Sequence, residues 1–591
     1  MSTPSIPFAI RTPIVLAPAM AAMACSGSPA AEPKRDLSEV VIADPSTCVD
    51  PRDHGAVPND GLDDRAALQA AIDLAKVSGR PVCLAPGRFD IQMNPGAGNQ
   101  NIESLRIWNT DGFTMVGAGS RSVLAFKGSG ISPGTTVPRD WWLLGLRGAR
   151  NTHLGHFEID GAARFDTDEQ THAIQLTHLP AGFDGNPSPI STRGTTLEHV
   201  DFFDPHLPRP AGSVPCGEAP AGQMCQRPNH GGTPILCAQI PGYSRCSVTN
   251  GPAASTWTLL GFFGGGDCVR LAAEETLGVR VADTTVEGSR ATCDRSFVAL
   301  QRGVDGYRVV NNTVDAVDDT AVDEEPTGEG TARRAYIVGN TFHRGGGRKA
   351  GILLTMSGNT EDSTENVISG NLLDGSISAY NTSNTIFAFN TITIAEDNTT
   401  NIQLIKRGSG NRIFGNTLVR EATAAAGNAI LVRLHNSGFP SDVIISDNVI
   451  RMRSDGNAIQ AEPAVGLVVD GNIIEGSGPT ADTFSAFVTR GSESVGTGSQ
   501  RITFTGNQVR GRFRRMFIEG QFMTQVNHAT VITGNIFEPA TTGSTISGVV
   551  FESGCPTPAP IVDGNVFRGL PAARHVEGAC GAGWIGQNSG P

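Results

Sequence analysis

The sequence predicts an all-β protein built as a parallel β-helix, a solenoid in which each coil of the chain stacks on the one before. Three observations predict it: a composition suited to short strands and turns, a motif that repeats once per coil, and a second strand that accompanies the motif. The chain has 591 residues, enough for about three or four globular domains. A solenoid needs no such division, because its core grows along one axis.

The composition favours many short strands over globular cores. Glycine is abundant at 72 residues, aromatic residues make up 6% of the chain, and hydrophobic residues make up 39%. The formal net charge of −13 argues against a nucleic-acid partner, because phosphate binding needs a basic face. No nicotinamide, flavin or nucleotide motif is apparent. No internal run approaches the roughly 18 apolar residues that predict a membrane span.

The repeating motif is an apolar pair, often a glycine, then an asparagine, then another apolar pair. Its asparagines lie roughly 19 to 35 residues apart, which predicts one coil per repeat. Glycine and asparagine tolerate the positive φ of a sharp turn, and stacked asparagines can hydrogen-bond between coils. A β-propeller, the alternative, has longer repeats without this signature. The motif occurs at 310–314, 338–342, 369–373, 388–392, 414–418, 446–450, 469–473, 505–509, 533–537 and 562–566.

A second strand precedes each asparagine motif by roughly 15 residues. Its apolar residues alternate with others, so one set faces the core and the other faces outward. The expected strands are 173–178, 268–275, 297–302, 352–356, 402–407, 430–435 and 459–462. This alternation predicts that stacked coils present one outward face carrying Arg270, Glu274, Gln301, Gln403, Arg433, His435 and Glu462.

Residues 50–95 carry the start of the solenoid. Asp63 or Asp64 can cap a helix that ends at Gly79, followed by a short strand over 81–84 and the turn APGRF. The helix is expected to bury Ala66, Leu68, Ala71, Ile72 and Ala75.

This Gly-Ala-Val, Asp-Gly and Asp-Asp stretch, with its helix, strand and Pro-Gly turn, resembles the N-terminal segment of the pectate-lyase superfamily. The same opening occurs in polygalacturonase-like hydrolases, mannuronan C5-epimerases and phage tailspikes. The resemblance implies a single-stranded right-handed parallel β-helix of the pectin-lyase type over residues 45–591, with an N-terminal capping helix. It also implies a polysaccharide partner held in a groove along the coils. It does not choose among reactions, because function lies in sites grafted on folds.

The first residues predict export. Arg11 precedes an apolar run that ends in small residues before Cys25, so residues 1–24 are expected to be a signal peptide and residues 25–44 a flexible tether. The pattern resembles a bacterial lipobox, which predicts a lipid anchor on Cys25 and no other membrane contact. An ordinary cleavage site and secretion are the alternative. Without Cys25 an even ten of the 11 cysteines remain, as expected for disulfides in an oxidising compartment.

One long interruption lies at residues 207–262, rich in cysteine, proline and glycine. A loop of this length is expected to be functional or stapled. Its four cysteines, at 216, 225, 237 and 246, favour stapling, and its position predicts that it walls one side of the outward face.

The densest acidic cluster, DAVDDTAVDEEP at 315–326, is the first candidate site. Asp323 and Glu325 could act as acid and as base or nucleophile on a glycosidic bond. Asp318 and Asp319 could hold Ca²⁺, the one cofactor that the sequence brings into consideration. A solvated acidic turn is the alternative.

Cationic and imidazole groups form the second candidate site. Cleavage of a polyuronate by elimination needs a cation for the substrate carboxylate and a base for the C5 proton. Solubilising surface charge is the alternative. The candidate catalytic groups are Arg270, Glu274, Arg433 and His435, with Gln301, Gln403, Lys406 and Arg407 expected to bind substrate.

Two short matches carry little weight. Asp204-Pro205-His206 resembles the core of the mannuronan C5-epimerase site, but Leu207 stands where an acidic residue follows in that family. Gly266-Asp267-Cys268 resembles the Asp-Asp-Cys of polygalacturonases with one aspartate missing. The sequence therefore predicts an exported, monomeric carbohydrate-active enzyme, a polysaccharide lyase or glycoside hydrolase. A non-catalytic surface adhesin is the alternative, and a polyuronate C5-epimerase the third hypothesis.

Overall fold

The computed structural model describes the solenoid and its N-terminal cap, and residues 40–591 form one compact unit. Among the described residues no helix is long and apolar enough to cross a membrane. The described residues are 47–92, 102–127, 141–160, 171–203, 224–227, 235–240, 243–248, 256–259, 267–273, 277–293, 296–317, 320–324, 332–343, 350–354, 363–395, 400–422, 427–434, 438, 440–478, 484–490, 499–521, 528–540, 546–552, 558–578 and 586–589.

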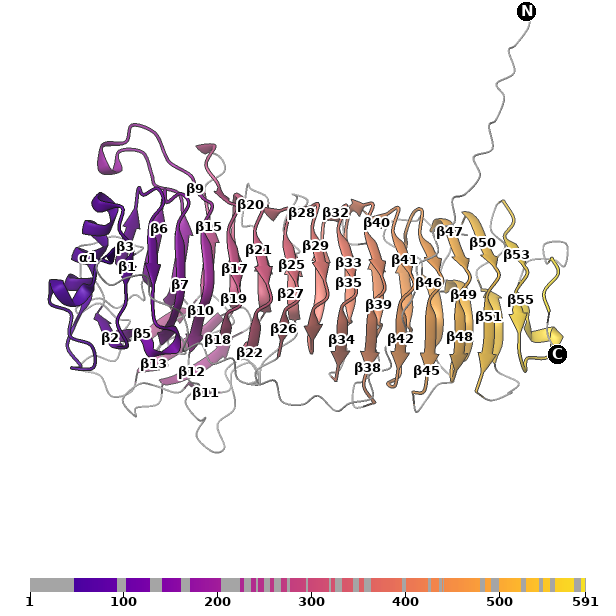
Figure 1. Ribbon diagram of the computed structural model, residues 1–591. Helices are drawn as coiled ribbons and strands as arrows, with labels where there is room; N and C mark the ends of the chain where they lie inside the picture. The colour runs from indigo at the N-terminus through magenta and orange to yellow at the C-terminus, as the bar shows by residue number, and fades with distance from the viewer. Residues whose placement is uncertain are drawn as a thin grey trace, which may run out of the picture. The chain divides into compact units, whose positions relative to one another are not determined.

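Each coil of the chain contributes strands to parallel ladders that surround one core (Figure 1). The pairings are parallel throughout these ladders, which confirms the predicted right-handed parallel β-helix. One face is a 15-stranded sheet: β3 (Ile102–Trp108), β6 (Trp141–Arg147), β8 (Thr171–Thr177), β15 (Val269–Ala272), β19 (Ser296–Leu300), β23 (Thr320–Glu324), β27 (Ala350–Leu354), β31 (Ser376–Tyr380), β35 (Ile402–Ile405), β39 (Ile430–Arg433), β43 (Ile459–Glu462), β46 (Ser485–Arg490), β49 (Arg515–Gln521), β52 (Ser547–Phe551) and β55 (Val576–Gly578).

The other faces belong to a 28-stranded sheet, in which two ladders share the long strands β7 and β10. Its strands are β1 (Val82–Cys83), β2 (Gly87–Gln92), β4 (Thr114–Val116), β5 (Ser122–Lys127), β7 (His153–Asp160), β10 (Thr196–Phe203), β17 (Thr285–Glu287), β18 (Arg290–Cys293), β21 (Arg308–Val310), β22 (Thr313–Val317), β25 (Tyr336–Val338), β26 (Thr341–Phe342), β29 (Val367–Ser369), β30 (Leu372–Leu373), β33 (Ile386–Ala388), β34 (Thr391–Ile394), β37 (Arg412–Phe414), β38 (Thr417–Arg420), β41 (Ile444–Ser446), β42 (Val449–Met452), β44 (Val468–Asp470), β45 (Ile473–Gly476), β47 (Gln500–Thr505), β48 (Gln508–Gly511), β50 (His528–Thr533), β51 (Ile536–Pro539), β53 (Ile561–Asp563) and β54 (Val566–Phe567).

Short strands at the bends of the coils form smaller parallel sheets. Four of them pair as β9 (Thr192–Arg193), β16 (Val281–Ala282), β20 (Val304–Asp305) and β24 (Ala332–Arg333). Two further pairs are β28 (Ser363–Thr364) with β32 (Thr382–Ser383) and β36 (Gly408–Ser409) with β40 (Pro440–Ser441).

The N-terminal end is covered by α1 (Arg65–Ser78), as predicted. Gly79 ends the helix in the left-handed conformation. Ala67 is buried where Ala66 was expected, and the other four predicted helix positions are buried. Asp64 precedes the helix without capping it, because its carboxylate accepts hydrogen bonds from the Val57 and Asp90 backbone instead. The Asp64 side chain therefore ties the preceding loop to β2.

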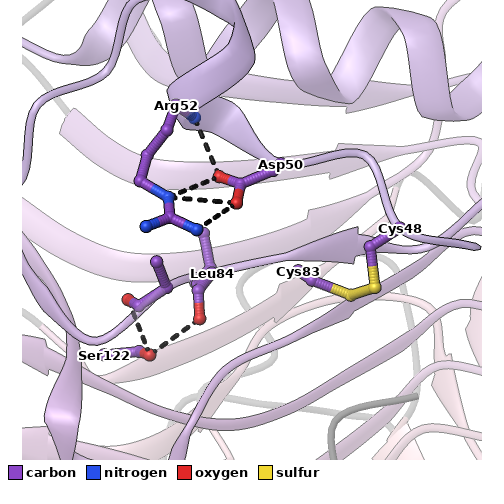
Figure 2. A network of polar contacts seen from close by, with 7 residues as sticks. Cys48, Asp50, Arg52, Cys83, Leu84 and Ser122 are labelled. Carbon is purple, nitrogen blue, oxygen red and sulfur yellow. Dashed lines mark hydrogen bonds and ion pairs between the residues drawn. A yellow bond between two sulfur atoms is a disulfide. The ribbon is translucent and has the colours of Figure 1, made fainter. Parts of the chain in front are cut away.

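The first strands are fastened by local contacts that Figure 2 shows. Cys48 and Cys83 form a disulfide, and Asp50 accepts hydrogen bonds from the backbone and guanidinium of Arg52. The Ser122 hydroxyl donates to the carbonyl of Leu84 at 2.9 Å. These contacts secure the edge at which the solenoid begins.

The asparagine motif forms a hydrogen-bonded ladder along the coils. In each repeat the asparagine side-chain oxygen accepts the backbone N–H and the side-chain amide of the preceding asparagine, at about 2.9–3.1 Å from Asn312 to Asn340 and onward. Gly339, just before Asn340, has a φ of +70°, which makes the bend between β25 and β26. The stacking predicted from the repeats is confirmed for Asn312, Asn340, Asn371, Asn390, Asn416, Asn448, Asn472, Asn507, Asn535, Asn565 and Asn588.

Apolar side chains fill the core along the described coils. Towards the C-terminal end the core contains an aromatic stack in which the ring centroids of Phe537 and Phe567 lie 5.1 Å apart. A polar exception is Glu324, which is fully buried and accepts a hydrogen bond from the Tyr307 hydroxyl at 2.6 Å. Burial, followed by the neighbouring Glu324, raises the pKa of Tyr307 well above its usual value, so the phenol stays protonated as the donor.

The predicted insertion contains a four-stranded antiparallel sheet: β11 (Met224–Arg227), β12 (Ile235–Ile240), β13 (Tyr243–Val248) and β14 (Thr256–Leu259). Its register sets Cys225 opposite Cys237, and Cys237 opposite Cys246. Beyond the insertion, Cys268 and Cys293 form a second disulfide across the core, between β15 and β18. The prediction that cysteines pair is confirmed for these two disulfides.

Candidate functional site

The outward face of the 15-stranded sheet carries four of the residues predicted to act on a substrate, Arg270, Asp323, Gln403 and Arg433. Strand register arranges the backbone positions of the sheet in columns that run from coil to coil. The paired backbone positions of the central column are Arg106, Gly145, Gln175, Arg270, Ala299, Asp323, Leu353, Ser378, Gln403, Leu431, Gln460, Val488, Ile518, Val550 and Glu577. Residues on either side of this column, such as Val269 and Leu271, belong to the core.

Arg270 and Asp323 share the central column two coils apart, with Ala299 between them. Coils spaced by about 4.8 Å place their Cα atoms about 10 Å apart. The small Ala299 side chain leaves the guanidinium room to extend toward Asp323. Arg270 is half-buried, whereas Asp323 is only 1% exposed although it faces outward. The register therefore sets residues of the two predicted candidate sites, Arg270 and Asp323, in one column of this face.

A second buried carboxylate, Asp267, lies three residues before Arg270 and so precedes β15. The next residue, Cys268, belongs to the core and is held there by its disulfide. Continuing the register of β15 and β19 sets Asp267 level with Ser296, and Ser296 pairs with Thr320. All three side chains are buried.

The first coils of the same face hold an aromatic and cationic cluster that the sequence analysis missed. Trp108 lies on β3 with the guanidinium carbons of Arg106 and Arg147 4.9 Å and 5.4 Å from its ring centroid. The Phe183 ring packs edge-on against Trp108 at 5.5 Å. Glu103, 1% exposed, forms an ion pair with Arg147, and burial raises its pKa despite the two arginines.

The later coils place Gln403 and Arg433 on the same sheet, away from Asp323. Gln403 donates a hydrogen bond to Ser378. Arg433 Nε lies 3.2 Å from Glu462 Oε2, so its charge is paired on the face. Arg490 lies 3.9 Å from the other carboxylate oxygen of Glu462. The register sets Gln403 three coils beyond Asp323, which excludes one sugar unit contacting both.

The remaining predicted binding residues occupy bends. Gln301 directly follows β19 and is half-buried. Lys406 follows β35 and is only 6% exposed, and burial followed by the nearby Arg407 lowers its pKa. Arg407 itself is exposed. Of these three, Arg407 is the one open to a ligand in solution.

The acidic stretch at 315–326 does not form one cluster. Asp315 lies on β22 of the 28-stranded sheet, where it pairs with Arg290. Asp323 faces outward from the other sheet, and Glu324 points into the core. Chain folding separates these residues because the coil turns between β22 and β23. Among the described residues of this stretch, Asp315, Asp323 and Glu324 therefore do not share one site.

Several predicted residues lie outside the described ranges: Glu274, Glu325, His435, the calcium candidates Asp318 and Asp319, and Cys25, the lipidation candidate, with the rest of residues 1–44. Among the described residues no three His, Cys, Asp or Glu side chains are grouped so as to hold a metal ion. The roles of these residues stay predictions.

A titratable cluster also lies on the 28-stranded sheet. Glu158 on β7 is directly opposite Asp201 on β10. Burial, then the charges of Asp160 and Asp201, raises the pKa of Glu158 to about 7. On the same two strands the rings of His156 and His199 stack at 5.3 Å. These residues do not belong to the face that carries Asp323.

Comparisons with known proteins give structural likenesses only. No family model matches the sequence, and no curated protein does. Among solved structures, a mutant tailspike protein of E. coli bacteriophage HK620 in complex with a pentasaccharide is 13% identical, with 92% of this chain and 78% of that chain covered and a TM-score of 0.42. The catalytic unit of a thermostable GH87 alpha-1,3-glucanase from Streptomyces thermodiastaticus is 12% identical, with coverages of 92% and 72% and a TM-score of 0.35. PfbA, a surface adhesin of Streptococcus pneumoniae, is 13% identical, with coverages of 89% and 90% and a TM-score of 0.30.

Proposed function

We propose that the chain binds a polysaccharide along the outward face of the 15-stranded sheet and hydrolyses it there. The supporting observation is a buried carboxylate, Asp323, on that face, together with a second buried carboxylate, Asp267, just before β15. Glycoside hydrolases of most families use two carboxyl groups that flank the scissile bond. Arg270, in the column of Asp323, supplies a cation for an acidic sugar or a developing negative charge.

The test is cleavage of a polysaccharide panel by the purified protein, with and without calcium. The panel contains pectate, alginate, glycosaminoglycans and neutral glucans. Hydrolysis produces reducing ends without ultraviolet absorbance, and NMR of the first product reports its anomeric configuration. Asp267→Asn and Asp323→Asn should each abolish cleavage, while Asp563→Asn, an exposed aspartate on β53, should leave it unchanged. Unsaturated products would instead establish a lyase and overturn the hydrolytic assignment.

A second function, binding without cleavage, is favoured by a different observation. Charged side chains on the later coils form ion pairs with one another, as Arg433 and Arg490 do with Glu462. An ion pair holds these side chains in a fixed position, from which they can contact a bound polysaccharide. Retention on an immobilised polysaccharide without any product from the panel would support this function. Such a result would make the chain a surface adhesin and remove the catalytic role from both aspartates.

Export remains part of the proposal. The disulfides Cys48–Cys83 and Cys268–Cys293 are typical of an oxidising compartment. Whether the chain is secreted or anchored through Cys25 is tested by metabolic labelling with a fatty acid, in which Cys25→Ala should remove the label from an anchored protein.

A further inference from the structure

The aromatic and cationic cluster of the first coils has the features of a separate sugar subsite. It consists of Arg106, Trp108, Arg147 and Phe183, with Glu103 beneath them. Trp108 contacts both guanidinium groups and the Phe183 ring, so it fixes their relative positions. A guanidinium that stacks over an indole ring points its N–H groups outward in its own plane, so they stay able to donate hydrogen bonds at the edge of the guanidinium.

The charge of the cluster is positive in a chain whose net charge is −13. Glu103 is the carboxylate that pairs with Arg147, and Arg106 acts on the same Glu103 through its charge. The cluster therefore contains one carboxylate and two guanidinium groups, so one positive charge is not compensated within it. An anionic ligand would compensate that charge.

The cluster also presents an apolar surface. The Phe183 side chain is 46% exposed although it packs on Trp108. The faces of a pyranose ring carry C–H groups that pack on an aromatic ring, while its substituents reach polar groups at the rim. An exposed ring beside guanidinium donors thus fits a sugar that carries a carboxylate.

We infer that this cluster binds a uronate unit of a polysaccharide, at a distance from the reacting bond. The inference rests on the proposed function for its polysaccharide, and it narrows the substrate class to acidic glycans. Arg106 and Asp323 share the central column five coils apart, about 24 Å. Only a chain long enough to span that distance occupies the subsite and the place of Asp323 at the same time.

The experiment measures binding to the Asp323→Asn protein, which prevents turnover, by titration calorimetry. The probes are polygalacturonate and alginate as polyuronates, and dextran and pullulan as neutral polymers. We expect binding to a polyuronate, and a loss of about tenfold or more for Arg106→Gln added to the Asp323→Asn background. Arg106→Lys, which keeps the charge but loses the guanidinium stacked on Trp108, should restore only part of the affinity. Phe183→Ala should weaken binding where Phe183→Tyr does not.

The matched control is Arg412→Gln, because Arg412 is an exposed arginine on the 28-stranded sheet. It should leave polyuronate binding unchanged, and circular dichroism should show that all variants are folded. Equal binding by the Arg106→Gln variant and its parent, or binding to the neutral polymers alone, would overturn the inference. A di- or trisaccharide of uronate, too short to reach both places, should bind with an affinity that does not depend on Asp323.

Failure of the inference and failure of the proposed function give different results. Asp323-dependent cleavage of a neutral glucan that Arg106→Gln leaves unchanged would overturn the uronate subsite and keep the hydrolase. Arg106-dependent binding of a polyuronate by a protein that cleaves nothing would keep the subsite and overturn the hydrolase.

Discussion

The coils up to β23 and the coils from β27 onward use the same fold differently. In the central column the earlier coils carry Arg106, Arg270 and Asp323, whereas the later coils carry uncharged residues from Leu353 to Val550. The asparagine ladder shows the opposite distribution, because it begins at Asn312 and continues through the later coils. Except for Glu577 on β55, the charged residues of the central column lie in the coils up to β23, whereas Arg433 and Glu462 pair with each other beside the column in the later coils.

Among the described residues, two disulfides mark the irregular part. Cys48–Cys83 and Cys268–Cys293 fasten coils that lack ladder asparagines. The earlier coils are therefore held by individual contacts, and a substitution there should affect function more than the same substitution does in the ladder region.

The largest expected effect separates the two parts of the central column. Asp323→Asn should lower cleavage by about 10²–10⁴-fold, the usual contribution of an acid or base, without unfolding the protein. Val550→Ala, in the same column among the later coils, should leave the rate unchanged. Initial rates on the best substrate of the panel measure both. Equal rates for Asp323→Asn and the unsubstituted protein would show that Asp323 takes no part in cleavage and that the two parts of the column do not differ in function.

The ladder should dominate stability in the later coils. Asn416→Ala removes the acceptor for two donors of Asn390 and leaves the Phe387 carbonyl without its side-chain donor, which should cost about 4 kcal/mol. Ser289→Ala, just before the ladder begins, should cost less than about 1 kcal/mol, because its hydroxyl has no hydrogen-bond partner among the described residues. Urea unfolding compares the two variants. Similar costs would mean that the ladder does not distinguish the two parts.

The two disulfides of the earlier coils separate an effect on activity from an effect on stability. Replacing both Cys268 and Cys293 by alanine opens a 25-residue loop and should cost about 3 kcal/mol. Activity should fall as well, because Cys268 fixes the backbone that orients Asp267. The matched variant replaces Cys48 and Cys83, whose separation is 35 residues, and should lose similar stability with activity retained at a temperature where it is folded. Loss of activity in both variants would point to unfolding alone.

The smallest effect concerns Glu158 on the 28-stranded sheet. Its pKa is raised from 4.5 to about 7 in the folded chain, mainly by burial, then by Asp160 and Asp201, with Arg88 opposing. The folded state therefore holds this proton more tightly than the unfolded state does. The resulting stability is fully present below pH 4.5 and is lost as the pH rises through 7.

Glu158→Gln should therefore reduce the fall in melting temperature between pH 5 and pH 8. Partial exposure limits the effect to about 1–2 kcal/mol at pH 8. Glu365→Gln, the same change at an exposed glutamate just before β29, is the matched control. A Glu158→Gln protein with the original pH dependence would show that this carboxyl does not titrate abnormally.

The fold could be predicted because its signals are local and repeated. Asn340 and its counterparts carry both the turn and the inter-coil hydrogen bonds, so each repeat gives the same information. Strands such as β39 appear in the sequence as plain alternation, with Ile430 and Val432 inward and Arg433 outward. Helix α1 was predictable from its apolar spacing and Gly79.

The site was harder to predict because columns join residues that are distant in sequence. Arg270 and Asp323 were predicted from their strands, and the register sets them two coils apart. The Trp108 cluster was missed, since Trp108, Arg147 and Phe183 meet only when three coils stack. The reverse also occurs, because residues adjacent in sequence can lie apart in the fold. Asp323 and Glu324 face opposite sides of one strand, although the sequence places them in one acidic stretch.

The most direct test of a substrate groove on the earlier coils is a crystal structure of the Asp323→Asn protein with an oligosaccharide of the polymer that the unsubstituted protein binds or cleaves. The account predicts density along the outward face from Phe183 to residue 323, crossing the central column over β8, β15 and β19. Density confined to the 28-stranded sheet, or to the face of the later coils beyond β27, would contradict it.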